Sequence, residues 1–222
     1  MNKKLVAVCC LIFSILLNYS PVHAQQAKLE EFKAIQLLTP QMDGGKPLMQ
    51  ALKERKSSRE FSPKELSLQE LSNLLWAANG VNRPEQDLTT APTAMNLQEI
   101  EIYVVTALGA YLYKGKNNML APITAGDLRA VTGSQPFVAD APINLVFVAD
   151  IAKMGRIPAE ATAFYSATDT GFISQNVYLY CASAGLATVV RAWLDKPALA
   201  RAMKLRSDQM IILAQTVGYP KE

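Results

Sequence analysis

Apolar residues recur with a helical period in SPKELSLQELSNLLWAANG, residues 62 to 80. The three- and four-residue spacing places these apolar side chains on one helix face: Leu68, Leu71, Leu75 and Ala78. Ser67 followed by Glu70 is the capping-box pattern that begins a helix, and Gly80 is a residue type that ends one. A shorter pattern predicts one or two helical turns over residues 47 to 54.

Runs of β-branched and aromatic residues predict strands in the second half of the chain. They are IEIYVVTA from residue 100, AYLYKG from 110, PINLVFVAD from 142, LATVVRAWL from 186 and MIILAQTVG from 210. A one-glycine break separates the first two runs, so we expect them to pair as a hairpin. The third run is apolar throughout, which predicts a strand buried on both faces.

Three further segments predict helices: residues 123 to 133, 161 to 184 and 195 to 205. Half of the 222 residues are hydrophobic, which is enough for one sizeable core. At least four strands mixed with at least four helices, and no internal repeat, predict one domain of the α+β class in a three-layer αβα arrangement.

The first 24 residues have the pattern of a secretory signal peptide. Lys3 and Lys4 precede an apolar run over residues 5 to 17, and Val22-His23-Ala24 resembles a cleavage site. The run is too short to span a bilayer comfortably, although an uncleaved anchor is the alternative. We therefore expect an exported, periplasmic protein with no membrane attachment after cleavage. Residues 25 to 46 then form an N-terminal arm and residues 47 to 222 the folded domain.

Cleavage changes the chemistry that remains available. The formal charge of +3 includes Lys3 and Lys4 and no acidic residue of the segment, so the mature chain carries +1, which does not support nucleic-acid binding. The only histidine, His23, is removed, which excludes Ser-His-Asp hydrolysis, a histidine metal centre and a histidine base. Cys181 is the one cysteine left and is expected to be a small buried residue.

A basic segment follows the first helical pattern. Arg55, Ser57 and Arg59 are spaced i, i+2, i+4, so in an extended chain their side chains share one face. Two guanidiniums and a hydroxyl on one face suit a dianionic phosphate. The alternative, which the spacing alone favours, is a solvated basic end of a helix.

Two loops add candidate ligand contacts. Pro92, Thr93 and Asn96 stand just before the strand from residue 100, where a turn with a hydroxyl and an amide can bind the edge of a heteroaromatic ring. An ordinary capped entry to the strand explains the same pattern. In AGLATVVRAWLD, the small residue Ala192 lets a backbone N–H approach a ligand closely, although a plain edge strand is the alternative.

The order of these stretches resembles the FMN-dependent nitroreductase family. RKSSR, LSNLLWAANG, APTAMNLQ with EIEIYVV, GLATVVRAWLD and the closing VGYP appear in the family's order over about residues 47 to 220. Within the family, the chain is most similar to the branch that includes thiazoline and oxazoline peptide oxidases. The resemblance implies a mixed, mainly antiparallel sheet flanked by helices, and a homodimer with its flavin site at the subunit interface.

The resemblance also implies which residues bind FMN. The family's R-x-S-x-R motif matches Arg55, Ser57 and Arg59, assigned to the phosphate and ribityl chain, with Lys56 in the same segment. The segment Val190, Arg191 and Ala192 matches the stretch whose backbone N–H groups face the flavin N5 and O4. Ala192 stands where glycine is common in the family.

A second motif implies contacts from the other subunit. Pro92, Thr93, Asn96 and Gln98 match P-S-x-x-N-x-Q, with Thr93 in place of serine and the hydroxyl retained. Ala94 and Met95 would then lie against the flavin ring.

The implied chemistry is an FMN-dependent ping-pong transfer from a small-molecule electron donor to a small acceptor, with no metal and no catalytic side chain. NADH and NADPH are the family's usual donors, but an exported protein does not meet them in quantity. Two alternatives stay open: an exported flavin-binding protein of the same fold without turnover, and an exported binding module for another phosphorylated ligand.

Overall fold

The computed structural model describes residues 32–155 and 157–221. The contacts divide the chain into residues 1–33 and residues 34–222, and the domain below is the second of these units. The predicted signal peptide and the first residues of the predicted arm lie outside the described residues. Within the described part, no helix is both long enough and apolar enough to cross a membrane.

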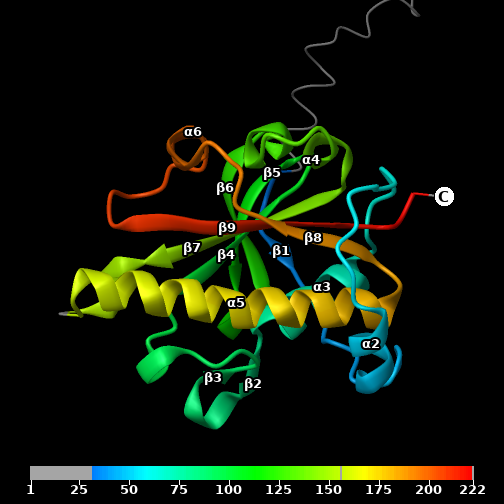
Figure 1. Ribbon diagram of the computed structural model, residues 1–222, viewed down its shortest axis with the longest axis horizontal. Coiled ribbons are helices and arrows are strands. Elements are labelled where there is room, and N and C mark those ends of the chain that lie inside the picture. The colour runs from blue at the N-terminus through cyan, green and yellow to red at the C-terminus, as the bar shows by residue number, and fades with distance from the viewer. Residues whose placement is uncertain (1–31, 156, 222) are drawn as a thin grey trace, which may run out of the picture. The chain divides into compact units, whose positions relative to one another are not determined.

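Seven strands form one sheet in the order β1-β6-β5-β4-β7-β9-β8 (Figure 1). Their bounds are β1 Ile35–Gln36, β4 Ile100–Val105, β5 Gly109–Lys114, β6 Met119–Ala125, β7 Ile143–Asp150, β8 Ala187–Arg191 and β9 Gln209–Gly218. Every strand pairing described in this sheet is antiparallel. A separate antiparallel pair is made by β2, Val81–Arg83, and β3, Leu88–Thr89.

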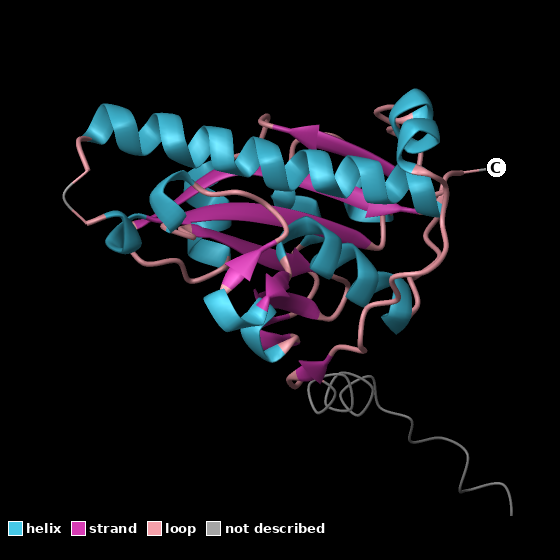
Figure 2. Cartoon of the chain, turned by 90° about the horizontal axis from the view of Figure 1, so that it is seen from below, coloured by secondary structure: helices cyan, strands magenta, loops and turns pink. Residues whose placement is uncertain are grey.

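Helices cover both faces of the sheet. In Figure 1, α2 (Leu48–Glu54), α3 (Leu68–Asn79) and α5 (Ala159–Ala184) lie below the sheet, and α4 (Phe137–Asp140) and α6 (Lys196–Ala202) lie above it. Short 3-10 turns fill the connections: Pro84–Gln86, Ala94–Asn96, Gly115–Asn117, Arg129–Thr132 and Ile151–Met154. Viewed from below, α5 runs along the length of the sheet (Figure 2). The predicted α+β class with its mainly antiparallel sheet is confirmed.

The central strand β7 is buried at every position, as its apolar sequence predicts. Strand β4 shows why both helical layers are needed. Its Tyr103 and Val105 belong to the core that includes Leu199 and Met203 at α6, whereas Ile102 and Val104, which point to the opposite face of the sheet, are buried there. Each face of the sheet therefore needs its own cover.

Two expectations about local structure were wrong. Residues 123 to 133 do not form one helix: β6 continues to Ala125 because Thr124 and Ala125 pair with β5, and only residues 129–132 make a 3-10 turn. In α3 the buried face contains Leu71, Leu74, Leu75 and Ala78, while Leu68 is 39% exposed. The apolar face of α3 is thus centred on Leu71, Leu74 and Leu75, and its first leucine faces outward.

The predicted N-terminal arm contributes to the sheet. Ile35 pairs with Leu120 and Gln36 with Met119, which makes β1 an edge strand, and Leu37 is buried. Residues 35 to 37 are therefore tied to β6.

The capping box predicted for α3 is present and allows a test of local stability. Ser67 Oγ accepts a hydrogen bond from the Glu70 amide, and the Glu70 carboxylate accepts one from the Ser67 amide. We expect Ser67→Ala to lower the free energy of unfolding by about 1 kcal/mol, measured by urea denaturation, because it removes the acceptor at the helix start. Ser67→Gly is the control, since glycine is a tolerated cap and costs only a few tenths. Equal losses in the two variants would contradict this account.

Candidate functional site

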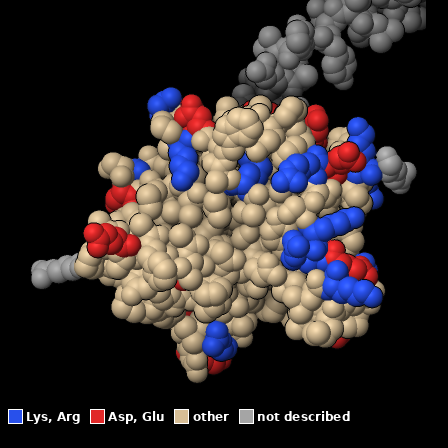
Figure 3. Space-filling model, in the orientation of Figure 1, with Lys and Arg blue, Asp and Glu red and all other residues tan. Residues whose placement is uncertain are grey.

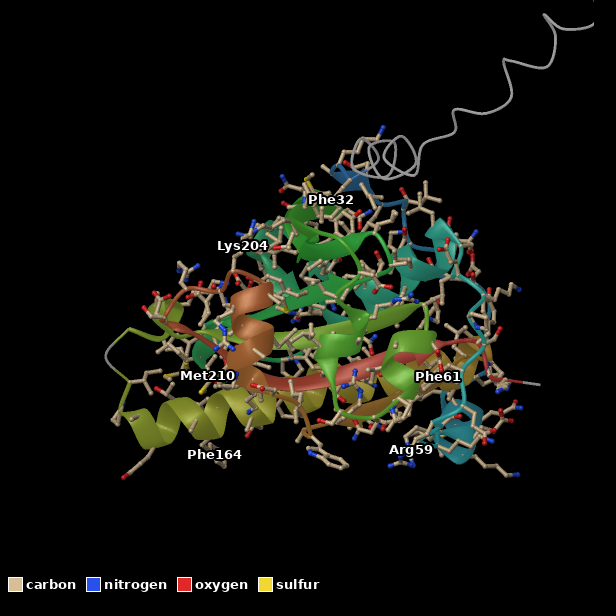
Figure 4. All side chains as sticks on the ribbon, turned by 90° about the horizontal axis from the view of Figure 1, so that it is seen from above. Phe32, Arg59, Phe61, Phe164, Lys204 and Met210 are labelled. Carbon is tan, nitrogen blue, oxygen red and sulfur yellow. The ribbon has the colours of Figure 1, made fainter. Side chains whose placement is uncertain are left out.

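The basic segment after α2 runs along the open edge of β8. The Ser58 amide donates to the Thr188 carbonyl oxygen at 2.9 Å, which fixes the segment in an extended conformation beside the strand. Alternate side chains therefore point to opposite sides. Arg55 and Ser57 point toward Tyr178 on α5, and Arg59, two residues on, is exposed (Figure 4). This geometry places Arg55 and Ser57 on the side of Tyr178, and the sharing of that side by Arg59 stays a prediction.

Tyr178 connects two of the three predicted site segments. Its hydroxyl lies 2.8 Å from Ser57 Oγ and accepts the Val190 amide hydrogen at 3.0 Å. The Arg55 guanidinium lies over the Tyr178 ring, 5.2 Å from its centroid, in a cation–π arrangement. Tyr178 carries no sequence signal of this role, because an aromatic residue within a long helix does not indicate a link between two distant segments.

The open edge of β8 presents backbone donors, and not all of them bond to an acceptor among the described residues. Val190 N–H is taken by Tyr178, whereas Ala192 N–H faces the same open edge because alternate amides of a strand point the same way. Among the described residues no acceptor bonds to the Ala192 amide, and Ala192 itself is exposed. Of the predicted segment, Ala192 is therefore the residue whose amide is available to a ligand.

The Arg191 side chain points away from this edge and is only 5% exposed. Its guanidinium donates to Asn144 Oδ1 at 2.6 Å, to Thr216 Oγ1 at 2.9 Å and to the Thr132 carbonyl oxygen at 2.5 Å. No carboxylate among the described residues pairs with it, and burial lowers the pKa of the guanidinium to about 10. The side chain of Arg191 thus ties the 3-10 turn at residues 129–132 to the sheet.

A cavity of about 600 Å³ opens on the other side of the basic segment. Lys56, Ser58 and Glu60 line it, together with Glu54, whose carboxylate pairs with Lys46 Nζ at 2.5 Å. The lining carries three lysines, Lys46, Lys56 and Lys221, beside its two carboxylates, and Tyr178 borders this cavity as well. Cys181 also borders the cavity, where complete burial raises the pKa of its thiol, so it behaves as the buried residue we expected.

The loop before β4 has an unusual backbone. Met95, Asn96 and Gln98 have φ values of 52°, 54° and 48°, in the left-handed region that costs non-glycine residues about 1–2 kcal/mol each. The Met95 side chain is exposed, and Asn96 Oδ1 accepts from Gln98 Nε2 at 3.0 Å. Strained residues that the surrounding structure holds in place are typical of functional loops.

One chain does not bring this loop to the basic segment. The loop meets α5 through the Ala94 amide, which donates to Asp169 Oδ2 at 2.8 Å, whereas Ser57 meets α5 at Tyr178. Nine residues separate Asp169 from Tyr178, which is about 13 Å along the helix axis and about two and a half turns. The two contacts therefore lie on opposite sides of α5.

The outer side of α5 is apolar and exposed. Phe164 is 66% and Phe172 is 44% exposed, and the small residues Ala163, Ala167 and Gly171 between or beside them are exposed too. We call these five residues the α5 outer face. Figure 3 shows few charged side chains over α5, while basic side chains gather over α2 and the segment after it.

The described residues contain no group of three or more His, Cys, Asp or Glu side chains that could hold a metal ion. The candidate site therefore consists of the basic segment, the Ala192 amide at the edge of β8, and the strained loop at residues 92 to 98.

Known proteins share both the sequence and the fold. The nitroreductase family model matches residues 52–219. A Methanocaldococcus jannaschii protein assigned by name to the nitroreductases is 34% identical over 159 residues, which are 67% of this chain and 80% of that protein.

Two solved structures extend the comparison. A Ralstonia eutropha structure described as a nitroreductase has a TM-score of 0.82 and 44% identity, with 86% of this chain and 90% of that chain covered. A chain of the Escherichia coli microcin synthetase complex has a TM-score of 0.66 and 18% identity, with 94% and 85% covered, and shows likeness of fold alone. With the family model matching well over half of its length, the chain belongs to the nitroreductase family.

Proposed function

We propose that the chain is an FMN-dependent oxidoreductase that works as an exported homodimer. The observation that carries the proposal is the joining of Arg55, Ser57 and the β8 edge around Tyr178, beside an unused amide at Ala192. This arrangement places cations, a hydroxyl and a backbone donor along one exposed strip. Membership of the nitroreductase family supports an oxidoreductase, and flavin is the family's usual cofactor.

The phosphate of FMN is assigned to the side of the segment that carries Arg55, Ser57 and Arg59. Guanidiniums make paired, charge-assisted hydrogen bonds with phosphate oxygens, and Ser57 adds a hydroxyl. The ring is assigned to the β8 edge, where the Ala192 amide is free to donate. A donor held in place at this edge stabilises negative charge on a bound ring without reorganisation.

The remaining ring contacts are assigned to the partner subunit's copy of the strained loop, which comprises Pro92, Thr93, Ala94, Met95 and Asn96. Within one chain this loop and Ser57 contact opposite sides of α5, so a complete site needs a second copy. The exposed apolar α5 outer face supports association, because contiguous exposed apolar patches mark interaction sites.

FMN supplies the redox-active atom, N5, through which a hydride or electron pair passes. The protein binds and orients the cofactor, and we assign no side chain to acid–base catalysis. A ping-pong order, in which the electron donor leaves before the small acceptor enters, is proposed from the family. We also propose, on the same ground, the similarity to the peptide-oxidase branch and a small-molecule electron donor.

The first test is the absorbance spectrum of the purified mature protein, with extraction and mass identification of any bound cofactor. We expect flavin absorption bands and FMN; a colourless protein that takes up no added FMN would contradict the proposal. Anaerobic reduction by candidate donors, followed by reoxidation with a quinone or a nitroaromatic compound, distinguishes an enzyme from a flavin-binding protein without turnover.

Two neighbouring cations test the placement of the phosphate. Arg59 and Lys56 are both exposed, but they point to opposite sides of the extended segment. We expect Arg59→Gln to raise the FMN dissociation constant about 10- to 100-fold, because it removes a charge-assisted bond of about 1.5–3 kcal/mol, and Lys56→Gln to raise it less than threefold.

Fluorescence titration of the apoprotein with FMN measures both constants, and riboflavin, which lacks the phosphate, should bind both variants alike. A larger effect for Lys56→Gln would move the phosphate to the cavity on the other side of the segment.

A further inference from the structure

Two buried carboxyl groups lie behind the strained loop. Glu99, the residue before β4, is 0% exposed, and Asp169 of α5 is 2% exposed. Carboxylates are rarely buried unless they are paired with a cation or share a proton. Their position connects the loop to both the sheet and the long helix.

Both carboxyl groups bond directly to the loop. Thr93 Oγ1 donates to Glu99 Oε2 at 3.2 Å, and the Ala94 amide donates to Asp169 Oδ2 at 2.8 Å. Thr93 Oγ1 also accepts the Gln98 amide hydrogen at 3.1 Å, so one hydroxyl spans the loop. The second Glu99 oxygen, Oε1, is buried and has no hydrogen-bond partner among the described residues.

No cation among residues 32–155 and 157–221 bonds to the pair to balance two charges. Lys153 Nζ bonds to Glu101 Oε1 and the Gln98 carbonyl oxygen. The other charged groups on neighbouring elements also bond elsewhere: Arg83 to the Thr89 carbonyl oxygen, Lys116 to Asp87, and Arg206 to Asp150. Within the described part of the chain, Asp169 is the ionisable side chain whose charge acts on Glu99. Burial first, and then the Asp169 charge and a hydrogen bond between the two groups, raise the pKa of Glu99.

We propose that Glu99 and Asp169 share one proton and act as a clamp that holds residues 93 to 98 in their strained, ligand-ready conformation. Glu99 and Asp169 are positioning residues and touch no ligand themselves. The role of the clamp in flavin binding rests on the proposed function above. Its effect on the conformation of the loop requires no cofactor.

The clamp has a defined dependence on pH. An acid whose pKa is raised in the folded protein favours folding in its protonated form, so the clamp is intact at low pH and is lost as pH rises through the raised pKa. Above that pH two unscreened carboxylates repel each other, and the strained residues Met95 and Gln98 relax. The loop then opens, and flavin affinity falls with it.

Infrared spectroscopy of the full chain in heavy water tests the shared proton. We expect a carbonyl stretching band of a protonated carboxylic acid in mildly acidic solution, at a pH where a free glutamate side chain is already ionised, and we expect this band to disappear as the pH rises. We expect Glu99→Gln to abolish the band and Asp169→Asn to lower the pH at which it disappears. A wild-type band that disappears at the pH of free glutamate would overturn the proposal.

Hydrogen exchange of the Ala94 and Gln98 amides tests the clamp. In the wild-type chain we expect their protection factors, corrected for intrinsic exchange, to fall about tenfold or more from mildly acidic to mildly alkaline pH. Glu99→Gln cannot ionise and still offers an amide oxygen to Thr93, so its protection should stay constant. Glu101→Gln, two residues along the same strand, should behave as wild type.

Equal protection at both pH values in wild type, or the same fall in Glu99→Gln, would overturn the clamp. Both measurements use the chain without added flavin. A failed FMN titration would therefore contradict the proposed function and leave the clamp standing. If the protection of the loop changed with pH while the FMN affinity did not, the clamp would hold the loop but would not control flavin binding.

Discussion

Replacing Arg191 by methionine is expected to lower the free energy of unfolding by about 2–5 kcal/mol. The side chain is buried, and its guanidinium bonds to Asn144, Thr216 and the Thr132 carbonyl oxygen. Methionine fills a similar volume but leaves the Thr132 carbonyl oxygen and Thr216 Oγ1 without this donor, at about 1–3 kcal/mol each, while Asn144 Oδ1 still accepts from the Thr216 hydroxyl at 2.7 Å. Urea denaturation followed by circular dichroism measures the change.

The matched control is Arg201→Met. Arg201 is an exposed residue of α6, so we expect a change within about 0.5 kcal/mol. Arg191→Lys should fall between the two, because an ammonium keeps the charge but cannot reach the acceptors that a planar guanidinium serves. If Arg191→Met were no worse than Arg201→Met, the buried guanidinium would have no structural role.

Arg191 also illustrates what the sequence could not reveal. Its position in a strand before an exposed loop, and the family resemblance, both drew attention to the backbone of residues 190 to 192. That its side chain would turn inward to Asn144 and Thr216 depends on strands far away in sequence. The alternation of β8 decides the direction of the side chain, but only the assembled sheet supplies the acceptors.

Elements with a strong local signal were predicted well. The start of α3 at its capping box, the buried β7 and the hairpin of β4 and β5 each follow from residues close in the chain. By contrast, β6 contains Pro122 and little alternation, and its pairing with β5 and β1 decides its conformation. The local sequence pattern therefore fails to predict a strand whose conformation depends on pairing with its neighbouring strands.

The candidate site was predicted in its parts but not in its connections. The spacing of Arg55 and Ser57 indicated a shared face, yet Tyr178 lies 121 residues from Ser57 and no pattern joins them. The pairing of Glu99 with Asp169 is equally invisible, because an acid in a helix of small residues is usually solvated. The contacts between distant segments come from the fold alone.

Helix α5 has apolar residues of its own on all sides, so its sequence does not indicate which side faces the sheet. Its sheet-facing side includes Ser166, Asp169, Thr170 and Ser174, whereas Phe164 and Phe172 face outward. Apart from Glu160 in its first turn, the helix has no exposed charged residue. The exposed apolar residues of such a helix are accounted for if a partner covers its outer side. The next variant tests this for the α5 outer face.

The double variant Phe164→Asp, Phe172→Asp is expected to prevent both self-association and FMN binding while leaving the fold intact. Both side chains are exposed within one chain, so the substitutions should cost little in the isolated subunit. In a dimer they would place unpaired charges in an apolar interface, weakening association by about 100-fold or more. Analytical ultracentrifugation and FMN titration give the two readouts, and circular dichroism checks the fold.

Val131→Asp is the matched control, because Val131 is an exposed apolar residue of the 3-10 turn at 129–132, in the layer on the other face of the sheet. It should remain dimeric and bind FMN normally. The double variant should lose both properties together, because one chain separates the loop at Ala94 from Ser57 on opposite sides of α5 and a site built from both needs two copies. A monomeric double variant that still binds FMN with unchanged affinity would contradict the two-subunit site.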